Sequence, residues 1–390
     1  MKAAKHILPI IVIAQFCCTS LWFAGNGIMS DLIANFGLSA GALGHLTSAV
    51  QFGFILGTLS FAIFTITDRF SPSKVFLSCA LVGALFNLGI CLNANSYASM
   101  LILRFLTGFF LAGIYPVGMK IAADHFDKNL NKSLGFLVGA LVLGTAFPHL
   151  AKDLTASLPW KAVIVSTSFL AAFGGILLFI LVPDGPYRRP GKQLKLSAFF
   201  DVFSHRNFRS AAFGYIGHMW ELYAFWAFVP VILKSYFGPD NPFSLSSLSF
   251  SIIAIGGIAC VLGGFLAQRK GNKKVAFAAL LSSCICCLLS PLAFELSSEF
   301  VFLGFLLFWG MVVIMDSPLF SAMVAQNAAP EIKGTALTIV NCIGFAITIV
   351  SIQVLTFLQD MLDPSLLYMV LGIGPLIGLW SLSKFKTSNT

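Results

Sequence analysis

Twelve runs of apolar residues, each long enough to cross a lipid bilayer, constrain this chain more than any other feature. A membrane-spanning helix needs about 20 mainly apolar residues, and inside a bilayer a helix pairs all of its own backbone groups. The runs lie near residues 7–29, 41–66, 75–94, 99–122, 133–151, 161–183, 209–233, 246–268, 275–294, 300–325, 334–357 and 365–383. We therefore expect an all-α integral membrane protein with twelve transmembrane helices.

Composition supports this class and excludes others. Of the 390 residues, 58% are hydrophobic and 10% are charged, whereas soluble domains carry roughly 25% charged residues. The sequence has no Gly-x-x-x-x-Gly-Lys-Ser/Thr loop, so we expect no direct use of ATP. The nine cysteines lie in apolar runs without His at ligand spacing, so we expect no metal and no cofactor. Beyond the pair Glu221 and His218, we find no nucleophile–base constellation typical of an enzyme, so we do not expect an enzyme.

The longest connection divides the chain into six spans plus six. It runs from Asp184 to Phe208 and is polar and basic. We predict an N-terminal six-helix bundle over residues 1–184, a cytoplasmic linker over 185–208 and a C-terminal six-helix bundle over 209–390.

The placement of Lys and Arg predicts the orientation, because cytoplasmic loops of membrane proteins are enriched in these residues. With the N-terminus inside, all but four of the 24 Lys and Arg residues fall on the cytoplasmic side. The exceptions are Arg104, Lys152, Lys161 and Lys234. We expect a multi-pass protein of the cytoplasmic or inner membrane with both termini in the cytoplasm. A nucleic-acid-binding protein would instead carry a basic face on a soluble domain, so we expect no nucleic-acid partner.

Two basic loops about 200 residues apart are similar to one another and indicate an internal duplication. The first, residues 64–74, reads Phe-Thr-Ile-Thr-Asp-Arg-Phe-Ser-Pro-Ser-Lys, and the second, residues 264–274, reads Gly-Phe-Leu-Ala-Gln-Arg-Lys-Gly-Asn-Lys-Lys. A second correspondence has nearly the same offset. Pro116 precedes Ser133 by 17 residues, as Pro318 precedes Thr335.

With these loops and this division, the chain resembles the major facilitator superfamily of secondary transporters. The loop pattern of that family is Gly-x-Leu-Ala-Asp-Arg-x-Gly-Arg-Lys. In the first copy Asp68 and Arg69 match, while Phe64 and Ser71 stand where Gly is usual. The second copy lacks the acid, because Gln268 replaces it. Its matching residues are Gly264, Leu266, Ala267, Arg269, Gly271 and Lys273.

A further likeness to the family lies in the fourth span, where Arg104-Phe105-Leu106-Thr107-Gly108 resembles the family's Arg-x-x-x-Gly element. The resemblance implies two pseudo-symmetric bundles that rock around a central midplane cavity lined by spans 1, 4, 7 and 10. It also implies a small-molecule substrate, protons as the coupling ion and a protein that works as a monomer in the bilayer.

Ionisable residues inside spans are costly and mark functional sites, so they are the first candidates. Glu221 lies 12 residues after Arg209 in span seven, about 18 Å along a helix and close to the midplane. His218 lies three residues earlier, on the same helix face. We expect Glu221 to bind protons or substrate, with His218 tuning it. The alternative is a structural pair that braces span seven.

Two further charged residues join this proton-coupling or substrate group. Asp316 precedes Ser317-Pro318 in span ten, where Pro breaks the helical hydrogen bonding, so it serves as a second proton site or satisfies the freed backbone. Arg104, about one turn into span four, pairs with a carboxylate or binds an anion. The alternative is that it extends its side chain to the outer surface.

Uncharged polar and aromatic residues in the spans are candidates for the cavity wall. Pockets are mostly apolar with a few placed polar groups, and flat rings supply walls. The predicted cavity residues are Trp22, Asn26, Gln51, Trp220, Tyr223, Trp226 and Asn341.

The duplicated loops predict gating residues, namely Asp68, Arg69 and Arg269. We expect Asp68 to face the N-terminus of span eleven near Gly334, where the helix dipole favours a carboxylate. The small-residue pairs Gly53-x-x-x-Gly57 and Gly135-x-x-x-Gly139 predict close helix contacts on the packing and rocking surfaces.

These features predict a secondary active transporter that moves a small polar or organic solute by alternating access. Span five lacks the Gly-Pro element of many proton antiporters of the family, which favours proton-coupled uptake. The alternatives are a proton-coupled multidrug or metabolite efflux antiporter and a passive facilitator without ion coupling.

Overall fold

The computed structural model describes residues 6–126, 130–188, 203–238, 243–329 and 332–385, and all regular elements in these ranges are helices. The N-terminal half contains α1 (Ile7–Thr19), η1 (Asn26–Ile28), α2 (Met29–Phe36), α3 (Ala42–Ile63), α4 (Ile66–Arg69), α5 (Pro72–Gly89), α6 (Tyr97–Leu111), α7 (Tyr115–His125), α8 (Leu130–Leu154) and α9 (Lys161–Leu181). The C-terminal half contains α11 (Arg206–Phe237), α12 (Leu245–Lys270), α13 (Asn272–Phe294), α14 (Glu299–Met315), α15 (Ser317–Gln326), α16 (Lys333–Leu358), α17 (Pro364–Leu367), η2 (Tyr368–Gly372) and α18 (Ile373–Ser383).

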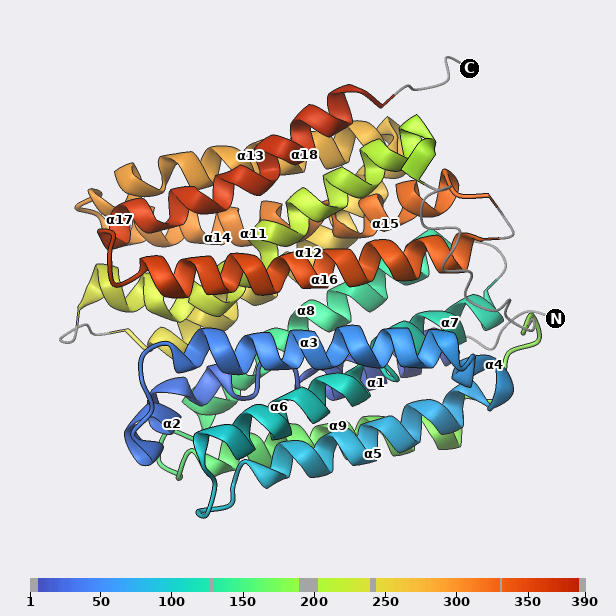
Figure 1. Cartoon of the computed structure of the whole chain (residues 1–390), viewed down its shortest axis with the longest axis horizontal. Helices are drawn as coiled ribbons and strands as arrows, with labels where there is room; N and C mark the ends of the chain where they lie inside the picture. The colour runs from blue at the N-terminus through green and yellow to red at the C-terminus, as the bar shows by residue number, and fades with distance from the viewer. Residues whose placement is uncertain (1–5, 127–129, 189–202, 239–242, 330–331, 386–390) are drawn as a thin grey trace.

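The expected fold class is confirmed: helices of the two halves form two bundles that lie against each other (Figure 1). Eleven helical segments in the described ranges are long and apolar enough to cross a membrane, and α1 is a shorter apolar helix. The halves meet along two seams, where α8 packs against α12 and α3 packs against α16.

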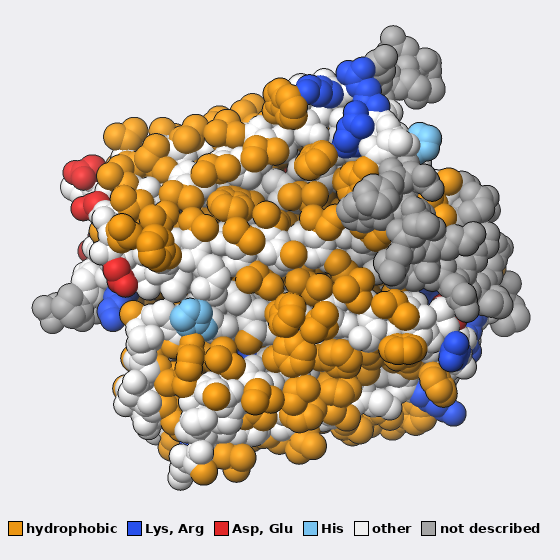
Figure 2. Space-filling view, in the orientation of Figure 1, with side chains coloured by type: hydrophobic (Ala, Val, Ile, Leu, Met, Phe, Trp, Pro, Cys, Tyr) orange, Lys and Arg blue, Asp and Glu red, His pale blue; other side chains and the backbone are white. Residues whose placement is uncertain are grey.

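The molecule has two chemically different ends. The N- and C-termini lie at one end together with α4, while α2 and α17 lie at the other (Figure 1). On the face in Figure 2, most Lys and Arg side chains gather at the end with the termini, and Asp and Glu gather at the other end. We call these the basic end and the opposite end. This separation is the charge asymmetry that the sequence predicts.

The first expected span is broken near its middle. Helix α1 ends at Thr19, and the chain continues through turns to η1 and α2. Gly27 permits this path, because a Cβ there would lie 2.9 Å from the backbone carbonyl of Pro148 on α8. Hydrogen bonds of the shorter 3₁₀ type, such as Trp22 N to Thr19 O at 3.0 Å, replace part of the helical pattern.

Spans four and ten break at corresponding positions, which is further evidence for duplication. Span four is interrupted between α6 and α7, just before Tyr115-Pro116. Span ten is interrupted at Asp316, just before Ser317-Pro318. Ile114, which precedes α7, and Asp316, which precedes α15, are separated by the same 202 residues as the two prolines.

The two duplicated loops place their left-handed residue differently. Gly271 ends α12 with φ +85°, a conformation natural to Gly. Its counterpart in the first loop is Ser71, with φ −59°, and there the chain turns earlier, at Thr65 with φ +50°. The first loop therefore breaks at Phe64-Thr65 into the short helix α4, whereas α12 continues without a break to Lys270.

The two small-residue pairs serve different interfaces. Gly53 faces α6 within its own half, because a Cβ there would lie 1.9 Å from the carbonyl oxygen of Phe105. Gly139 on α8 faces α12 of the other half, because its Cβ would lie 3.2 Å from the carbonyl oxygen of Gly257. Both pairs therefore make the predicted close helix contacts, but the pair on α3 packs inside one bundle and only the pair on α8 lies between the halves.

Candidate functional site

Six aromatic side chains meet at the middle of the molecule, three from each half. We call them the central aromatic cluster, and its members are Trp22, Phe23, Phe54, Tyr223, Trp226 and Phe345. All six side chains are buried. Trp22, in the break of the first span, lies 5.6 Å from Phe345 on α16 and 5.8 Å from Tyr223 on α11, measured between ring centroids. Aromatic contacts therefore close the centre of the interface between the halves.

The cluster carries hydrogen-bond donors that have no partner. The Trp22 indole donates to Oε1 of Gln51 at 3.3 Å. Within the described residues, Nε2 of the same Gln51 and Nε1 of Trp226 are buried without a hydrogen bond. Both side chains are 0% exposed, and a buried donor without a partner costs roughly 1–3 kcal/mol. Such groups are ready to bind an acceptor that enters the site.

Three predicted cavity residues lie outside the cluster. Asn26 in η1 donates to Thr47 on α3 at 2.9 Å, nearer the opposite end of the molecule. Asn341 accepts from Tyr215 at 2.6 Å, nearer the basic end. Trp220 is directed away, because its indole donates to the carbonyl of Val370 in η2 at 3.2 Å.

The sequence analysis missed half of the ring cluster, namely Phe23, Phe54 and Phe345. The chain has 40 Phe residues, and nothing in its spacing separates these three from rings that face lipid. Trp and Tyr were identifiable because they are rarer and carry a polar atom.

Arg104 stabilises the break in the first span. Its guanidinium donates to the carbonyl of Leu21 at 3.2 Å, to the carbonyl of Trp22, and to Oδ1 of Asn87 at 3.3 Å. The side chain is 1% exposed, so it does not extend to the surface as the alternative supposed. No carboxylate in the described chain pairs with it. The geometry indicates a cap for carbonyls freed by the break rather than a carboxylate partner.

His218 and Asp316 form a buried pair between α11 and the break of span ten. Nδ1 of His218 lies 2.8 Å from Oδ1 of Asp316, and both side chains are 1% exposed. Nε2 of His218 and Oδ2 of Asp316 have no hydrogen-bond partner among the described residues. The pair lies about five residues along α11 from Tyr223, or roughly 7.5 Å. It can hold a proton close to the ring cluster.

Glu221 does not face His218, although the two share a helix. Its Oε1 accepts from Trp309 of α14 at 2.6 Å, from Cys287 of α13 at 3.2 Å, and from Ser283 of α13. Glu221 is buried within the C-terminal half and lies near the middle of α11. The expected pairing of His218 with Glu221 is therefore not observed, and the carboxylate bridges three helices of one bundle.

Near the opposite end, polar contacts join the two halves. Gln353 of α16 donates to Ser48 of α3 at 2.8 Å. Asp153 of α8 accepts from Ser244 and, at 2.6 Å, from Ser247 of α12. These contacts lie along the two seams, so they close this end of the interface.

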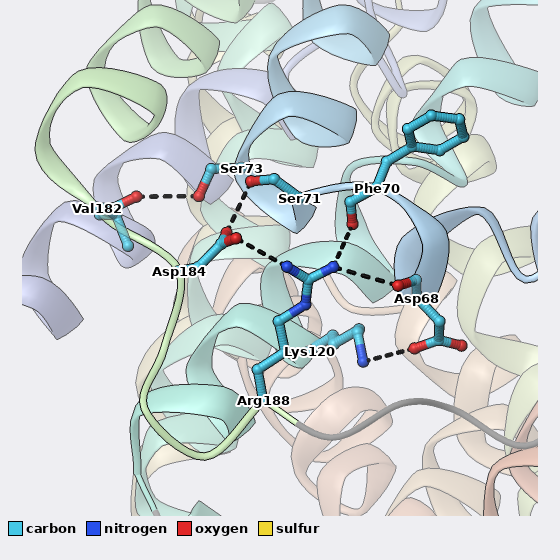
Figure 3. Close-up of polar contacts among 8 residues, drawn as sticks. All are labelled: Asp68, Phe70, Ser71, Ser73, Lys120, Val182, Asp184 and Arg188. Atoms are coloured by element: carbon cyan, nitrogen blue, oxygen red, sulfur yellow. Dashed lines mark hydrogen bonds and ion pairs between the residues drawn. The ribbon is translucent and has the colours of Figure 1, made fainter.

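Near the basic end, the expected gate residue Asp68 is bound within its own half. Its carboxylate pairs with Lys120 of α7 at 2.9 Å (Figure 3). The expected contact was with the start of α16 near Gly334. A Cβ on Gly334 would meet nothing within 4 Å in the described chain. The observed partner therefore differs from the predicted one.

Arg188, which the sequence analysis missed, fastens this loop. Its guanidinium donates to the carbonyls of Asp68 at 3.2 Å and Phe70 at 2.8 Å, and it pairs with Asp184 at 2.8 Å (Figure 3). Ser71 also donates to Asp184 at 2.7 Å. The start of the connection after α9 thus holds the first duplicated loop against the N-terminal half.

The other two predicted gate residues make no comparable contact with any residue that the structure describes. Arg69 donates through Nε to Oγ1 of Thr65 at 3.1 Å, inside the loop itself. Arg269 is exposed at the end of α12. The sequence signal for Arg188 was weak, because it is one of several Lys and Arg residues in the connection after Asp184.

The comparisons with known proteins agree with this architecture. The model of the family described as Major Facilitator Superfamily matches residues 11–352. The chain belongs to the major facilitator superfamily. In fold it is similar to the proton:xylose symporter XylE bound to 6-bromo-6-deoxy-D-glucose. That similarity has a TM-score of 0.77 at 14% identity and covers 97% of this chain and 95% of that one.

Among curated relatives, the uncharacterized MFS-type transporter YceJ of Bacillus subtilis is 25% identical over 334 residues, 83% of this chain and 82% of that protein. The putative uncharacterized transporter YgaY of Escherichia coli is 26% identical over 191 residues. The latter match spans about half of each protein, 47% of both. The superfamily consists of membrane transporters of small molecules, and this chain is one of its multi-pass integral membrane proteins.

Proposed function

We propose that this protein is a secondary active transporter that takes up a small organic solute together with protons, with the solute bound at the central aromatic cluster. The observation that carries the proposal is the buried His218–Asp316 pair. Ionisable groups inside a membrane are costly and are retained for function, especially in proton relays. This pair lies beside the ring cluster and joins α11 to the helix break in span ten.

The arrangement supports alternating access between two bundles, residues 1–184 and 209–390, joined by a linker over 185–208. The halves touch through side chains at the opposite end and at the ring cluster, whereas Asp68 near the basic end is bound within its own half. With the basic end in the cytoplasm, this is a conformation closed to the outside. Reopening requires the Ser48–Gln353 and Asp153–Ser247 contacts to separate.

The pair provides a physical link between protonation and movement. A proton on Asp316 removes its charge and weakens its attraction to His218, and the two residues sit on separate helices. The balance between two packings of span ten against α11 therefore depends on occupancy by a proton. A change of a few kcal/mol is enough to shift such an equilibrium.

The test uses membrane vesicles with a proton gradient imposed inward in one set and outward in the other, and a mixture of soluble metabolites. Mass spectrometry of the vesicle contents identifies solutes that accumulate with the wild-type protein. We expect accumulation under the inward gradient that a protonophore abolishes. Accumulation under the outward gradient alone would instead establish antiport. Equilibration without accumulation would establish a passive facilitator, and either result would overturn the proposal.

A further inference from the structure

We propose, on the basis of the proposed function, that the solute is a planar, unsaturated molecule whose polar groups are hydrogen-bond acceptors. It would insert between the rings of the central aromatic cluster and accept hydrogen bonds from Nε2 of Gln51 and Nε1 of Trp226.

The rings of the two halves contact one another across the interface. Trp22 lies 5.6 Å from Phe345 with an interplanar angle of 26°, and Phe23 lies 6.4 Å from Trp226 at 84°. When the halves separate, these contacts open and both faces lose their aromatic partner. A flat ring replaces the lost contacts on both faces at once, because stacked and edge-to-face arrangements are favourable beyond simple burial.

The polar atoms of the site are donors in need of acceptors. Oε1 of Gln51 is occupied by the Trp22 indole, which leaves the amide Nε2 as the free group of that side chain. Nε1 of Trp226 can only donate. A solute with carboxylate, carbonyl or ring-nitrogen acceptors satisfies both groups, whereas a solute with only donors leaves them unpaired.

Aromatic cages also bind ammonium groups, so a cationic solute is the alternative class. The charge around this cluster disfavours a cation. In the described chain, none of the six rings and no atom of Gln51 forms a hydrogen bond with a carboxylate, and the nearby carboxylate of Asp316 is paired with His218. Arg104 donates to the backbone carbonyl of Trp22 and pairs with no carboxylate of the described chain. The unpaired formal charge beside the cluster is therefore positive, which favours a neutral or anionic solute.

Binding to the purified full-length protein tests the solute class with four matched probes. Benzoate and nicotinamide are planar and carry acceptors. Cyclohexanecarboxylate keeps the carboxylate without the flat ring, and benzylammonium keeps the ring without an acceptor. We expect at least one of the planar acceptor probes to raise the melting temperature saturably, with an affinity at least tenfold above those of the other two. Equal or tighter binding of either control probe, or no binding of both planar acceptors, would overturn the inference.

Two variants locate the binding to the proposed atoms. Trp226→Phe keeps a flat ring and removes the donor, so the planar acceptor should bind about tenfold more weakly. Trp220→Phe, a tryptophan directed toward η2, is the matched control and should bind as the wild type does. Equal affinities in the two variants would contradict the assignment.

Gln51→Glu separates recognition from a structural role. The variant keeps an oxygen for the Trp22 indole and replaces the free donor by an acceptor, so preference should move from benzoate toward benzylammonium. An unchanged preference in a folded Gln51→Glu protein would contradict the inference. If Gln51→Glu does not fold, the affinity of Trp226→Phe for the planar acceptor provides the test. A non-planar solute that accumulates with protons in the vesicle assay would refute the solute class and leave the proposed function intact. Binding of a planar acceptor without proton-coupled accumulation would refute the proposed function and leave the solute class intact.

Discussion

His218 of α11 and Asp316, the residue at which α14 passes into α15, approach to 2.8 Å between Nδ1 and Oδ1 while almost completely buried. This contact links the longest helix of the C-terminal half to the only break in span ten that the structure describes. The His218–Asp316 contact therefore links proton binding to helix packing.

Asp316→Asn should uncouple transport from protons. The amide keeps the size and hydrogen-bonding capacity of the carboxyl group but cannot exchange a proton, so accumulation driven by a pH gradient should fall at least tenfold. Exchange of the same solute across vesicles at equal pH should persist. The matched control is Asp31→Asn, which removes an acid paired with Lys152 near the opposite end and should change accumulation less than twofold. Equal loss in both variants would count against a specific role for Asp316.

Glu221→Gln should leave transport nearly unchanged. An amide oxygen can still accept from Trp309 and Ser283, so the three-helix contact survives the loss of charge. We expect proton-driven accumulation within about threefold of the wild type. Glu221→Leu leaves those donors unpaired and should lower the free energy of unfolding by about 1–3 kcal/mol for each lost partner. Abolished accumulation in a stably folded Glu221→Gln protein would show that Glu221 takes part in proton coupling.

Arg104→Met should destabilise the N-terminal half. The change leaves the carbonyls of Leu21 and Trp22 without their donor in an apolar environment, at about 1–3 kcal/mol for each group. Arg104→Lys should recover only part of the lost stability. Its ammonium group can donate to a carbonyl, but it lacks the planar fork with which Arg reaches both carbonyls. Thermal unfolding of the purified variants measures the order wild type, Lys, Met. A Met variant as stable as the wild type would show that the break does not depend on Arg104.

Gly53→Ala and Gly139→Ala should have different consequences. A Cβ on Gly53 would lie 1.9 Å from a backbone oxygen of α6, so the N-terminal bundle itself must distort and its melting temperature should fall. A Cβ on Gly139 would lie 3.2 Å from a backbone oxygen of α12, so the seam between the halves need shift only by a few tenths of an ångström. We expect Gly139→Ala to fold normally and to change the transport rate instead. Loss of stability from Gly139→Ala comparable to that from Gly53→Ala would contradict this assignment.

The spans, their division and the duplication could be predicted because apolar length and repeated loops are properties of the sequence itself. The contact partners of individual side chains could not be predicted in this way. The i, i+3 spacing of His218 and Glu221 indicates a shared face. However, α14 and α15 lie beside α11 and side chains of α13 reach it, so the helix rotation decides which helix each residue meets. Trp220 and Trp226 are equally aromatic, but one is directed toward η2 and the other toward the centre. The role of Arg104 could not be predicted, because it depends on the helix break near Trp22, and the apolar pattern of the first span does not reveal that break.

A reversible cross-link between α3 and α16 tests the central claim, alternating access between the two halves, most directly. Near the opposite end, an ideal Cβ on Gly44 of α3 would lie 3.0 Å from Cβ of Thr356 on α16, so cysteines at these two positions should oxidise to a disulfide in the resting protein. The singly substituted proteins and the oxidised wild type, with its nine native cysteines, are the controls. The account predicts that the disulfide stops accumulation of the solute found in the vesicle assay and that reduction restores it. Undiminished accumulation with the disulfide intact would contradict it, because the halves would then not need to separate at this end.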